Sequence, residues 1–329
     1  MPTAFGKTRA SGSVPGRGHW HLILGLILAG LTLVATARPG SAQEPSSAAE
    51  GRPDLAPDIA RIVDRGELIV AMADMNTPPF FYRQGDDLAG LEVDMARELA
   101  RELRVGIRFD RSAKTFNDVI DVVAGGKADL GISKLSRTLS RAGKVRFSDP
   151  YLRLHHALAF NRLALARMAM DTPIPSIVRN FRGSLGVIAD SSFADFAKRH
   201  FPQASIRTYS SWPEVVAAVR SGEVVGAYRD EFEIKRLITS NPTIALTLRT
   251  VTLTDLEDTL GIAVGADSPV LLDLVNLFLA QRQEKLTIDK VLDAVKPYRN
   301  NRPAAPSMNP IPDLAGMDRD TDSKQERDR

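Results

Sequence analysis

An alternation of apolar strands with amphipathic helices is the feature that most restricts the fold of this chain. Residues 67–72 (ELIVAM) form a short apolar run, and in residues 91–103 large apolar side chains recur every four positions. The first pattern is typical of a buried strand and the second of a helix with one buried face. A strand at 105–109 and a helix at 116–124 follow, and two glycines end that helix. Strands that alternate with helices predict a parallel sheet covered on both faces.

The same alternation begins again after residue 180. It predicts strands at 185–189, 206–209 and 224–228, separated by helices at 193–199 and 212–220. Two such blocks predict two doubly wound α/β lobes.

Two further segments are candidates for strands that cross between the lobes, namely Ala157–Asn161 and Gly261–Val264. Two crossings make the first lobe discontinuous, with residues 56–156 and 250–300 in one lobe and residues 157–249 in the other. The sequence therefore predicts an α/β protein whose two doubly wound lobes are joined by a two-strand hinge.

The first 42 residues have the order of an export signal. Three basic residues precede the uncharged run 22–35 (LILGLILAGLTLVA), which is shorter than the roughly 20 apolar residues of a membrane-spanning helix. Small residues follow, so we expect cleavage after Ala42, with Ala37 as the alternative site. An uncleaved membrane anchor is the competing interpretation. We expect the mature protein in the periplasm.

The two ends of the mature chain have the composition of unfolded segments. Residues 43–55 are polar and contain proline, and we interpret them as a linker. Residues 301–329 contain four prolines and the charged run DRDTDSKQERDR. Such a tail buries too little apolar surface to offset its ordering entropy, so we expect it to be disordered.

The composition excludes several classes of function. The 329 residues include no cysteine, which excludes disulfides, thiolate metal sites, cysteine nucleophiles and the cysteine of a lipoprotein anchor. No motif predicts a cofactor or a metal. Residues 1–42 carry four basic side chains and no acid, so the net charge of +3 becomes −1 for the rest of the chain. A nearly neutral protein is not expected to bind nucleic acid.

The stretch from Ser133 to Arg141 (SKLSRTLSR) is the most informative one for a binding site. It follows a predicted strand at 129–132, and in open α/β sheets ligands bind at the carboxyl ends of strands. Thr138 suits the N-cap of a new helix, where free N–H groups favour an anion. Arg141 adds a planar cation that matches a carboxylate, and Ser136 adds a hydroxyl. A capped helix with a surface arginine would produce the same pattern.

The residues after Arg141 narrow these alternatives. Residues 138–151, T-x-x-R-x-x-x-V-x-F-S-D-P-Y, resemble the signature of the bacterial extracellular solute-binding proteins of the polar amino-acid family. Residues 66–80 (from GELIV to PPF), 90–95 (GLEVDM) and 126–129 (GKAD) resemble other motifs of that family. The resemblance covers about residues 56–298 and implies the fold of a type II periplasmic binding protein, which serves ABC importers.

The resemblance also implies roles for individual residues. Arg141 matches the arginine that holds the α-carboxylate of the ligand, with Ser136 on the same side. Asp230, in the second lobe, matches the aspartate that accepts the α-ammonium. Ser191 and Ser192 match the turn before a second-lobe helix. Phe116 matches the position that packs on the side chain of the ligand, and Asp74 matches an acid of a first-lobe loop.

Structural roles compete with these assignments. Phe116 suits a core position on a helix, and Asp74 can cap the loop before the two prolines. Asp230 can cap the helix that begins near residue 232, a role compatible with ligand binding. Ser191 and Ser192 can cap the helix at 193–199.

Three positions depart from the family pattern. Lys134 replaces a small residue near the ligand; it either points inward and contacts an acidic group or points outward. Asp190 replaces the glycine of the second-lobe turn. Thr77 stands where many relatives have an aromatic residue, which predicts a roomier pocket or an unusual ligand.

These observations predict a monomeric periplasmic protein that captures a free amino acid or close analogue by hinge closure and delivers it to the membrane subunits of an ABC importer. Binding, not catalysis, is the expected activity. One alternative is a periplasmic enzyme of the same fold, resembling the cyclohexadienyl or arogenate dehydratases, with Asp74 or Lys134 as general acid. The other is a ligand sensor for a membrane signalling partner.

Overall fold

The computed structural model describes residues 55–170 and 172–300. The predicted signal peptide, the predicted tail and all but the last residue of the predicted linker lie outside the described residues. Among the helices of the described part, none is both long enough and apolar enough to cross a membrane.

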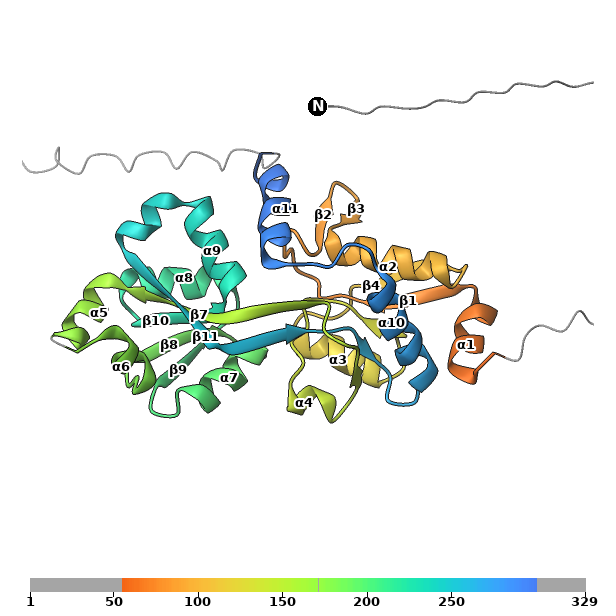
Figure 1. Ribbon diagram of the computed structural model, residues 1–329, viewed down its shortest axis with the longest axis horizontal. Helices are drawn as coiled ribbons and strands as arrows, with labels where there is room; N and C mark the ends of the chain where they lie inside the picture. The colour runs from red at the N-terminus through yellow and green to blue at the C-terminus, as the bar shows by residue number, and fades with distance from the viewer. Residues whose placement is uncertain (1–54, 171, 301–329) are drawn as a thin grey trace, which may run out of the picture. The chain divides into compact units, whose positions relative to one another are not determined.

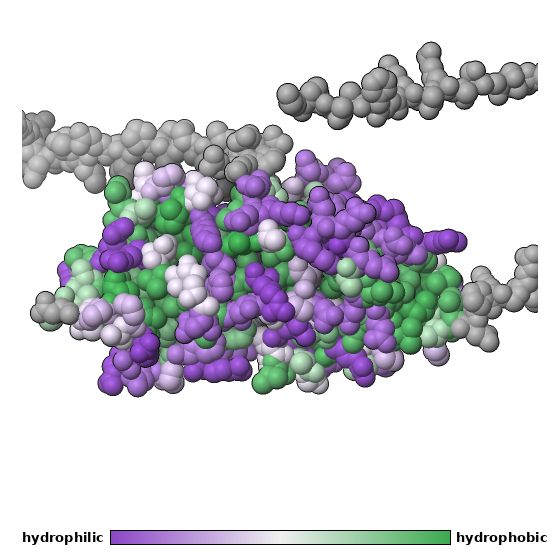
Figure 2. Space-filling view, viewed as in Figure 1, coloured by the Kyte–Doolittle hydropathy of each residue, from purple (hydrophilic) through white to green (hydrophobic). Residues whose placement is uncertain are grey.

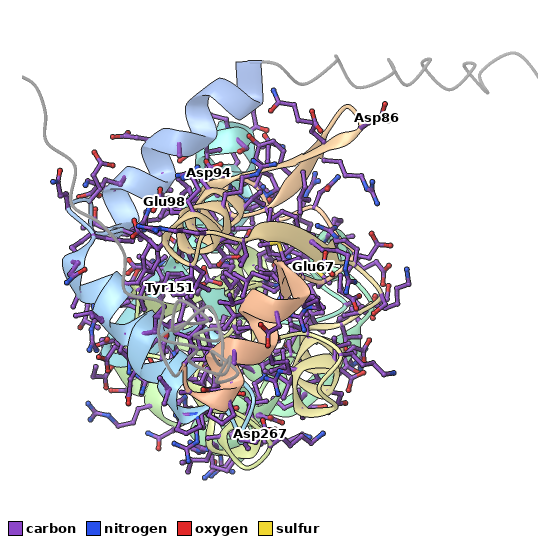
Figure 3. The ribbon with its side chains drawn as sticks, turned by 90° about the vertical axis from the view of Figure 1, so that its right-hand side faces the viewer. Glu67, Asp86, Asp94, Glu98, Tyr151 and Asp267 are labelled. Carbon is purple, nitrogen blue, oxygen red and sulfur yellow. The ribbon has the colours of Figure 1, made fainter. Side chains whose placement is uncertain are left out.

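Two mixed α/β sheets form the framework, and each is the centre of one lobe (Figure 1). The first sheet has the order β4-β1-β5-β12-β6 and comprises Gly106–Asp110, Glu67–Ala71, Leu130–Gly131, Ala263–Val264 and Arg146–Phe147. The second has the order β11-β7-β10-β8-β9 and comprises Leu248–Leu260, Leu152–Asn161, Gly226–Asp230, Ser184–Ile188 and Ser205–Tyr209. A separate hairpin pairs β2 (Tyr82–Gln84) with β3 (Asp87–Ala89), and Asp86 lies at its tip (Figure 3).

Helices flank both sheets. Those of the first lobe are α1 (Pro57–Arg65), α2 (Leu91–Glu102), α3 (Phe116–Ala124), α4 (Leu139–Ala142) and α10 (Pro269–Gln281). Those of the second lobe are α5 (Arg162–Ala169), α6 (Ile174–Arg179), α7 (Ser192–His200), α8 (Trp212–Ser221), α9 (Glu231–Ser240) and the 3₁₀ helix η1 (Pro242–Leu246). The last helix, α11 (Ile288–Asn300), packs against β7 and α9. The predicted alternation of strands and helices is confirmed in both blocks.

Each sheet separates two apolar cores, because side chains of a strand point alternately to opposite faces. In β1, Leu68 and Val70 belong to the core with α2 and α10, whereas Ile69 and Ala71 belong to the core with α3. In the second lobe, the side chains of β10 also alternate between two cores, with Tyr228 in the core on one face of the sheet and Ala227 in the core on the other. The double coverage that the sequence predicts is therefore present in both lobes, and the predicted fold class is confirmed.

Two long strands connect the lobes. β7 and β11 pair antiparallel from Leu152 opposite Leu260 to Asn161 opposite Leu248, with a register shift between Leu253 and Glu257 (Figure 1). The first predicted crossing, Ala157–Asn161, lies inside β7. The second crossing was predicted too late in the chain, because β11 ends before residue 261 and only Ala263–Val264 of the predicted segment forms β12.

The reason for this error is the burial of β11. It lies at the edge of its sheet, and most of its residues are exposed or only partly buried, so its sequence LRTVTLTDLEDTL lacks an apolar run.

The crossing strands also explain why the sheets are mixed and not parallel throughout. β7, β11 and β12 all run antiparallel to their neighbours, while β1, β4 and β5 in one lobe and β8, β9 and β10 in the other keep the predicted parallel pairing.

The outer surface has the ordinary mixture of residues. Hydrophilic side chains cover much of the face in Figure 2, and hydrophobic ones gather toward α1 and α10, where Leu55, Val270 and Leu277 are exposed. On α2, Asp94 pairs with Arg97 and is well exposed (Figure 3).

Candidate functional site

Residues of both lobes meet at one small cavity. Its lining consists of Phe116, Lys134, Ser136, Arg141, Ser191, Ser192, Phe193, Arg229, Asp230 and Asp258. The cavity measures about 20 Å³, which is room for about one water molecule. Seven of the eight predicted site residues are in this lining, so the structure brings together groups that lie more than 100 positions apart in the chain. A solute of amino-acid size needs the lobes to separate before it can enter.

Arg141 lies at the first-lobe side of the cavity and is 5% exposed. Its Nε donates to the side-chain oxygen of Asn117 at 3.0 Å and its Nη1 to the carbonyl oxygen of Ser136 at 3.1 Å. Its buried Nη2 has no hydrogen-bond partner among the residues that the structure describes. Burial lowers the pKa of Arg141 to about 10, so the guanidinium remains charged at neutral pH. Arg141 thus offers an oriented cationic donor to the cavity.

The helix of Arg141 differs from the sequence-based interpretation in one respect. Thr138 is the N-cap, as predicted, and its hydroxyl accepts the main-chain N–H of Arg141 at 3.3 Å. The helix α4, however, has only four residues. A single turn has almost no macrodipole, so any anion held here depends on the guanidinium and not on the helix end.

Hydroxyl groups of both lobes meet beside Arg141. The Oγ atoms of Ser136 and Ser192 are 2.8 Å apart, and Ser136 donates to Oδ2 of Asp258 at 3.0 Å. When Asp258 is ionised, Ser136 gives its one proton to this carboxylate, and Ser192 is then the donor in the contact between the lobes. Oδ1 of Asp258 is buried without a hydrogen-bond partner in the described part of the chain.

Asp258 comes from the crossing strand β11 and is 2% exposed. Burial raises the pKa of its carboxyl to about 7, and the nearby charge of Asp230 adds to this effect, whereas Ser136, Lys134 and Arg141 oppose it. The carboxyl therefore changes its charge near neutral pH. It can accept a hydrogen bond when ionised and donate one when protonated.

Lys134 points inward and spans the two lobes. Its Nζ is 2.9 Å from Oδ2 of Asp230 and 3.1 Å from Oε1 of Glu233, and the three side chains are at most 3% exposed. The rings of Phe80 and Phe232 have their centroids 5.2 Å from the same Nζ, within the range of cation–π attraction. Lys134 binds to acidic groups of the second lobe, which settles the alternative left open by the sequence in favour of the inward orientation.

The backbone of Lys134 is held in an unusual conformation. Its φ angle is 50°, in the left-handed region that side chains other than those of glycine, asparagine and aspartate rarely adopt. Its N–H donates to both carboxylate oxygens of the buried Glu92, at 2.9 and 3.0 Å, and Glu92 also accepts the hydroxyl of Tyr151. Burial raises the pKa of Glu92 to about 7, against the effect of these hydrogen bonds. Glu92 therefore holds the backbone of Lys134 in this conformation, while Asp230 and Glu233 hold its side chain.

Asp230 has two roles in the structure. Its Oδ1 accepts the N–H of Glu233 at 3.0 Å and so caps α9, one of the roles that its sequence position suggested. Its Oδ2 faces Lys134 and is 3.6 Å from Nε of Arg229. Glu233 is held in turn by Arg236, and these cations lower the pKa of Glu233 despite its burial.

The remaining predicted residues of the lining also have structural contacts. Phe116 begins α3 and is 6% exposed, and it belongs to a core of the first lobe as well as to the cavity wall. Ser191 precedes α7 but its hydroxyl donates to the carbonyl of Ile188 and does not cap the helix. Asp190, which replaces a glycine of the family pattern, has a φ angle of 52°, the conformation that glycine would adopt easily.

Asp74 is the predicted site residue that the cavity lining does not include. Its carboxylate is 2.8 Å from Lys114, 3.6 Å from Arg111 and 3.8 Å from Arg83. These cations, Lys114 above all, lower its pKa. A contact between Asp74 and a ligand remains a prediction from the sequence.

Four residues around the cavity were missed by sequence reasoning, namely Asp258, Arg229, Phe193 and Glu233. Arg229 and Glu233 flank Asp230 in the sequence, and Phe193 follows Ser192, so their neighbours were a usable signal. Asp258 has no such signal, because it reaches the site through the path of β11 between the sheets.

Two sheet-centred lobes, two connecting strands and a cavity of converging charged groups define a protein of the type II periplasmic binding fold. The family model of the bacterial extracellular solute-binding proteins, family 3, matches residues 68–294. The chain belongs to this family, as the sequence motifs indicated.

Individual relatives agree with this assignment. The chain is 31% identical over 131 residues to the arginine-binding extracellular protein ArtP of Bacillus subtilis (strain 168), covering 40% of this chain and 47% of the relative. It is 23% identical to the L-cystine-binding protein TcyJ of Escherichia coli (strain K12), over 69% of this chain and 82% of the relative. A match to the membrane-bound lytic murein transglycosylase F 1 of Alkalilimnicola ehrlichii has 30% identity but covers 26% of that protein. The chain thus spans less than half the length of two of these relatives.

A solved structure with the same fold is that of the ancestral amino acid-binding protein AncCDT-1, described as a precursor of cyclohexadienyl dehydratase. The identity is 26%, the TM-score is 0.57, and the match covers 72% of this chain and 98% of that structure.

Proposed function

We propose that this protein captures a small carboxylate solute, a free amino acid or a close analogue, between its lobes and delivers it to the membrane subunits of an ABC importer. The observation that carries the proposal is the buried, charged Arg141, which lines the cavity and whose Nη2 has no hydrogen-bond partner among the described residues. A buried donor without a partner costs about 1–3 kcal/mol, so its retention favours a ligand group that completes it.

Ser136, Ser192 and Asp258 are the further ligand contacts in this proposal, with Asp230 on the second-lobe side. The first lobe binds the carboxylate, and rotation about β7 and β11 closes the second lobe over it. Closure excludes water, which strengthens each charged contact. The family is described as extracellular, and we propose that the protein acts in the periplasm as a monomer.

An enzymatic role is the second candidate, and Asp258 is the observation that favours it. A carboxyl with a pKa of about 7 inside a cavity is suited to general acid catalysis. Prephenate or arogenate would lose water and carbon dioxide to form an aromatic product. Incubation with either compound, followed by the absorbance of that product, tests this role. No absorbance change would eliminate it.

The substitution Arg141→Ala tests the proposed function. A thermal-shift screen of amino acids and their analogues first identifies a solute that stabilises the wild type, and calorimetry then compares the variants. Loss of one partner of a buried charged contact costs about 2–5 kcal/mol, so Arg141→Ala should weaken binding about 30-fold to several thousand-fold. Lys144→Ala is the matched control, because Lys144 is 57% exposed and pairs with Asp121 on the surface. Equal affinities for Arg141→Ala and the wild type would refute the carboxylate contact.

A further inference from the structure

The ammonium of Lys134 occupies a pocket with the chemistry of an amine-binding site. Two carboxylates, those of Asp230 and Glu233, lie within 3.1 Å of Nζ. The rings of Phe80 and Phe232 are 5.3 Å apart and meet edge to face, and both lie beside the same ammonium. Carboxylates and aromatic rings are the groups by which proteins recognise alkylammonium ligands.

This pocket is assembled from both lobes, whereas its cation belongs to the chain itself. Lys134 follows the short strand β5 of the first lobe, and Asp230 and Glu233 lie at the start of α9 in the second lobe. Two hydrogen bonds from its N–H to Glu92 hold the left-handed backbone of Lys134 in place. Such strain at a buried polar residue persists only where surrounding groups enforce it.

We propose that Lys134 is a built-in substitute for the α-ammonium of an amino acid, and that the site therefore selects a carboxylate without an amino group, specifically a 2-hydroxy acid. This inference rests on the proposed function, because it narrows the solute class bound by Arg141. Asp230, which the sequence assigned to the ammonium of the ligand, is already neutralised by a cation of the protein.

The charges around the cavity support this selection. The lining contains the cations of Lys134, Arg141 and Arg229 and the acids Asp230 and Asp258, so its excess is one positive charge when Asp258 is ionised and two when Asp258 is protonated. Glu233 does not alter this excess, because Arg236 pairs with it. In either state a single carboxylate lowers the excess by one charge, whereas a zwitterion leaves the excess in place and adds a fourth cation to the cavity.

The remaining polar atoms suit a hydroxyl beside that carboxylate. Oδ1 of Asp258 lacks a partner, and the hydroxyls of Ser136 and Ser192 lie beside it. A hydroxyl on the carbon next to the carboxylate can donate to this oxygen while Arg141 holds the carboxylate itself.

The first arm of the test uses the wild-type protein and three matched pairs, L-alanine with L-lactate, L-leucine with 2-hydroxy-4-methylpentanoate, and L-phenylalanine with 3-phenyllactate. We expect a hydroxy acid to raise the unfolding midpoint and its amino acid to have a smaller effect. The inference is overturned when an amino acid stabilises the protein at least as strongly as its hydroxy acid. This outcome would also result if Asp258 bound the ammonium of the amino acid.

The second arm tests the ammonium pocket by chemical rescue. Lys134→Gly removes a four-carbon ammonium chain and suits the left-handed backbone, so the variant is expected to fold. n-Butylamine has the length of the missing group. At about ten times its dissociation constant it should raise the unfolding midpoint of Lys134→Gly by about 3–6 °C. The wild type and Lys134→Met, whose side chains fill the pocket, should show no shift.

The two arms separate the inference from the proposed function. An absent shift of Lys134→Gly with n-butylamine, or an equal shift of the wild type, overturns the role of Lys134. If neither member of any pair stabilises the wild type, the proposed function fails, and the butylamine result alone then decides whether Lys134 fills an ammonium pocket.

Discussion

The two ends of the interlobe cavity have similar burial but opposite states of hydrogen bonding. At one end, Lys134 is paired with Asp230 and Glu233, and each charge has a partner of opposite sign. At the other end, Nη2 of Arg141 and Oδ1 of Asp258 have no partner within the described residues. The ammonium and the two carboxylates of the first end are satisfied without a solute, although Nε of the neighbouring Arg229 makes no hydrogen bond to the described residues, whereas the second end lacks both a partner for a donor and a partner for an acceptor. Burial of charged residues therefore does not identify a ligand site here. Unpaired donors and acceptors favour one only where they also line the cavity, because Arg111 and His156 have buried nitrogens outside its lining that are unpaired within the described part of the chain.

The difference also predicts different functions for the two ends. A satisfied ion pair between the lobes stabilises the closed form of the protein itself. An unsatisfied donor stabilises that form only when a solute supplies the missing acceptor. Substitutions at the two ends should therefore separate stability from solute binding.

The largest effect on stability is expected for Asp230→Ala. The substitution leaves Lys134 with one carboxylate and removes the cap of α9. Loss of one partner of a buried ion pair typically costs about 3–5 kcal/mol of unfolding free energy. Urea unfolding of the variant and the wild type measures the difference. Asp121→Ala is the control, since its pair with Lys144 is exposed and should contribute less than about 1 kcal/mol. Similar losses in both variants would show that the Lys134 end is not a special source of stability.

The next effect concerns the pH dependence of stability. Burial and then the charge of Asp230 raise the pKa of Asp258 to about 7. The folded state therefore holds this proton between about pH 4 and pH 7, while the unfolded chain releases it near pH 4. The contribution of Asp258 to stability falls as the pH rises through this window, whereas His156, whose pKa burial lowers to about 4, contributes in the opposite direction up to about pH 6.5. The share of Asp258 is at most about 1.4 kcal/mol per pH unit, and about 2 kcal/mol between pH 5 and pH 7, because the carboxyl is half ionised at pH 7.

Asp258→Asn isolates this contribution, because asparagine keeps an acceptor for Ser136 and does not titrate. Its unfolding free energy should decline less steeply with pH than that of the wild type, which retains both Asp258 and Glu92 as groups with a raised pKa. Parallel curves for the two proteins from pH 5 to pH 8 would show that Asp258 does not hold its proton in the folded state.

Most of the fold could be predicted from the sequence, because strand and helix periods are local. The helix at 116–124 was predicted with its observed bounds, and most strands were found within one or two residues. Among the strands that the sequence did not predict, which include β2, β3 and β6, the long strand β11 is an edge strand whose burial does not produce an apolar run. Local pattern could not place it, since its partner β7 lies about 100 residues earlier in the chain.

The candidate site was predictable where it depends on a motif and not where it depends on the crossing of strands. Arg141, Ser136 and Asp230 lie in recognisable segments, and all three line the cavity. Asp258 becomes part of the lining because β11 carries it there. The pairing of Lys134 with Asp230 could not be predicted from the sequence either, because the two residues are 96 positions apart and meet only through the packing of the lobes.

The smallest effect on stability is expected for Arg141→Met, and it tests the comparison most directly. The substitution removes two hydrogen bonds, those to Asn117 and Ser136, but it also removes a buried cation with an unpaired N–H, and methionine keeps much of the volume. These contributions oppose each other, so we expect a loss of about 1 kcal/mol or less in urea unfolding, together with loss of solute binding in calorimetry. Asp230→Ala should be much less stable than Arg141→Met. A loss of 3 kcal/mol or more for Arg141→Met would make the two ends equivalent as sources of stability, and Arg141 would then be a structural residue and not an incomplete half of a binding site.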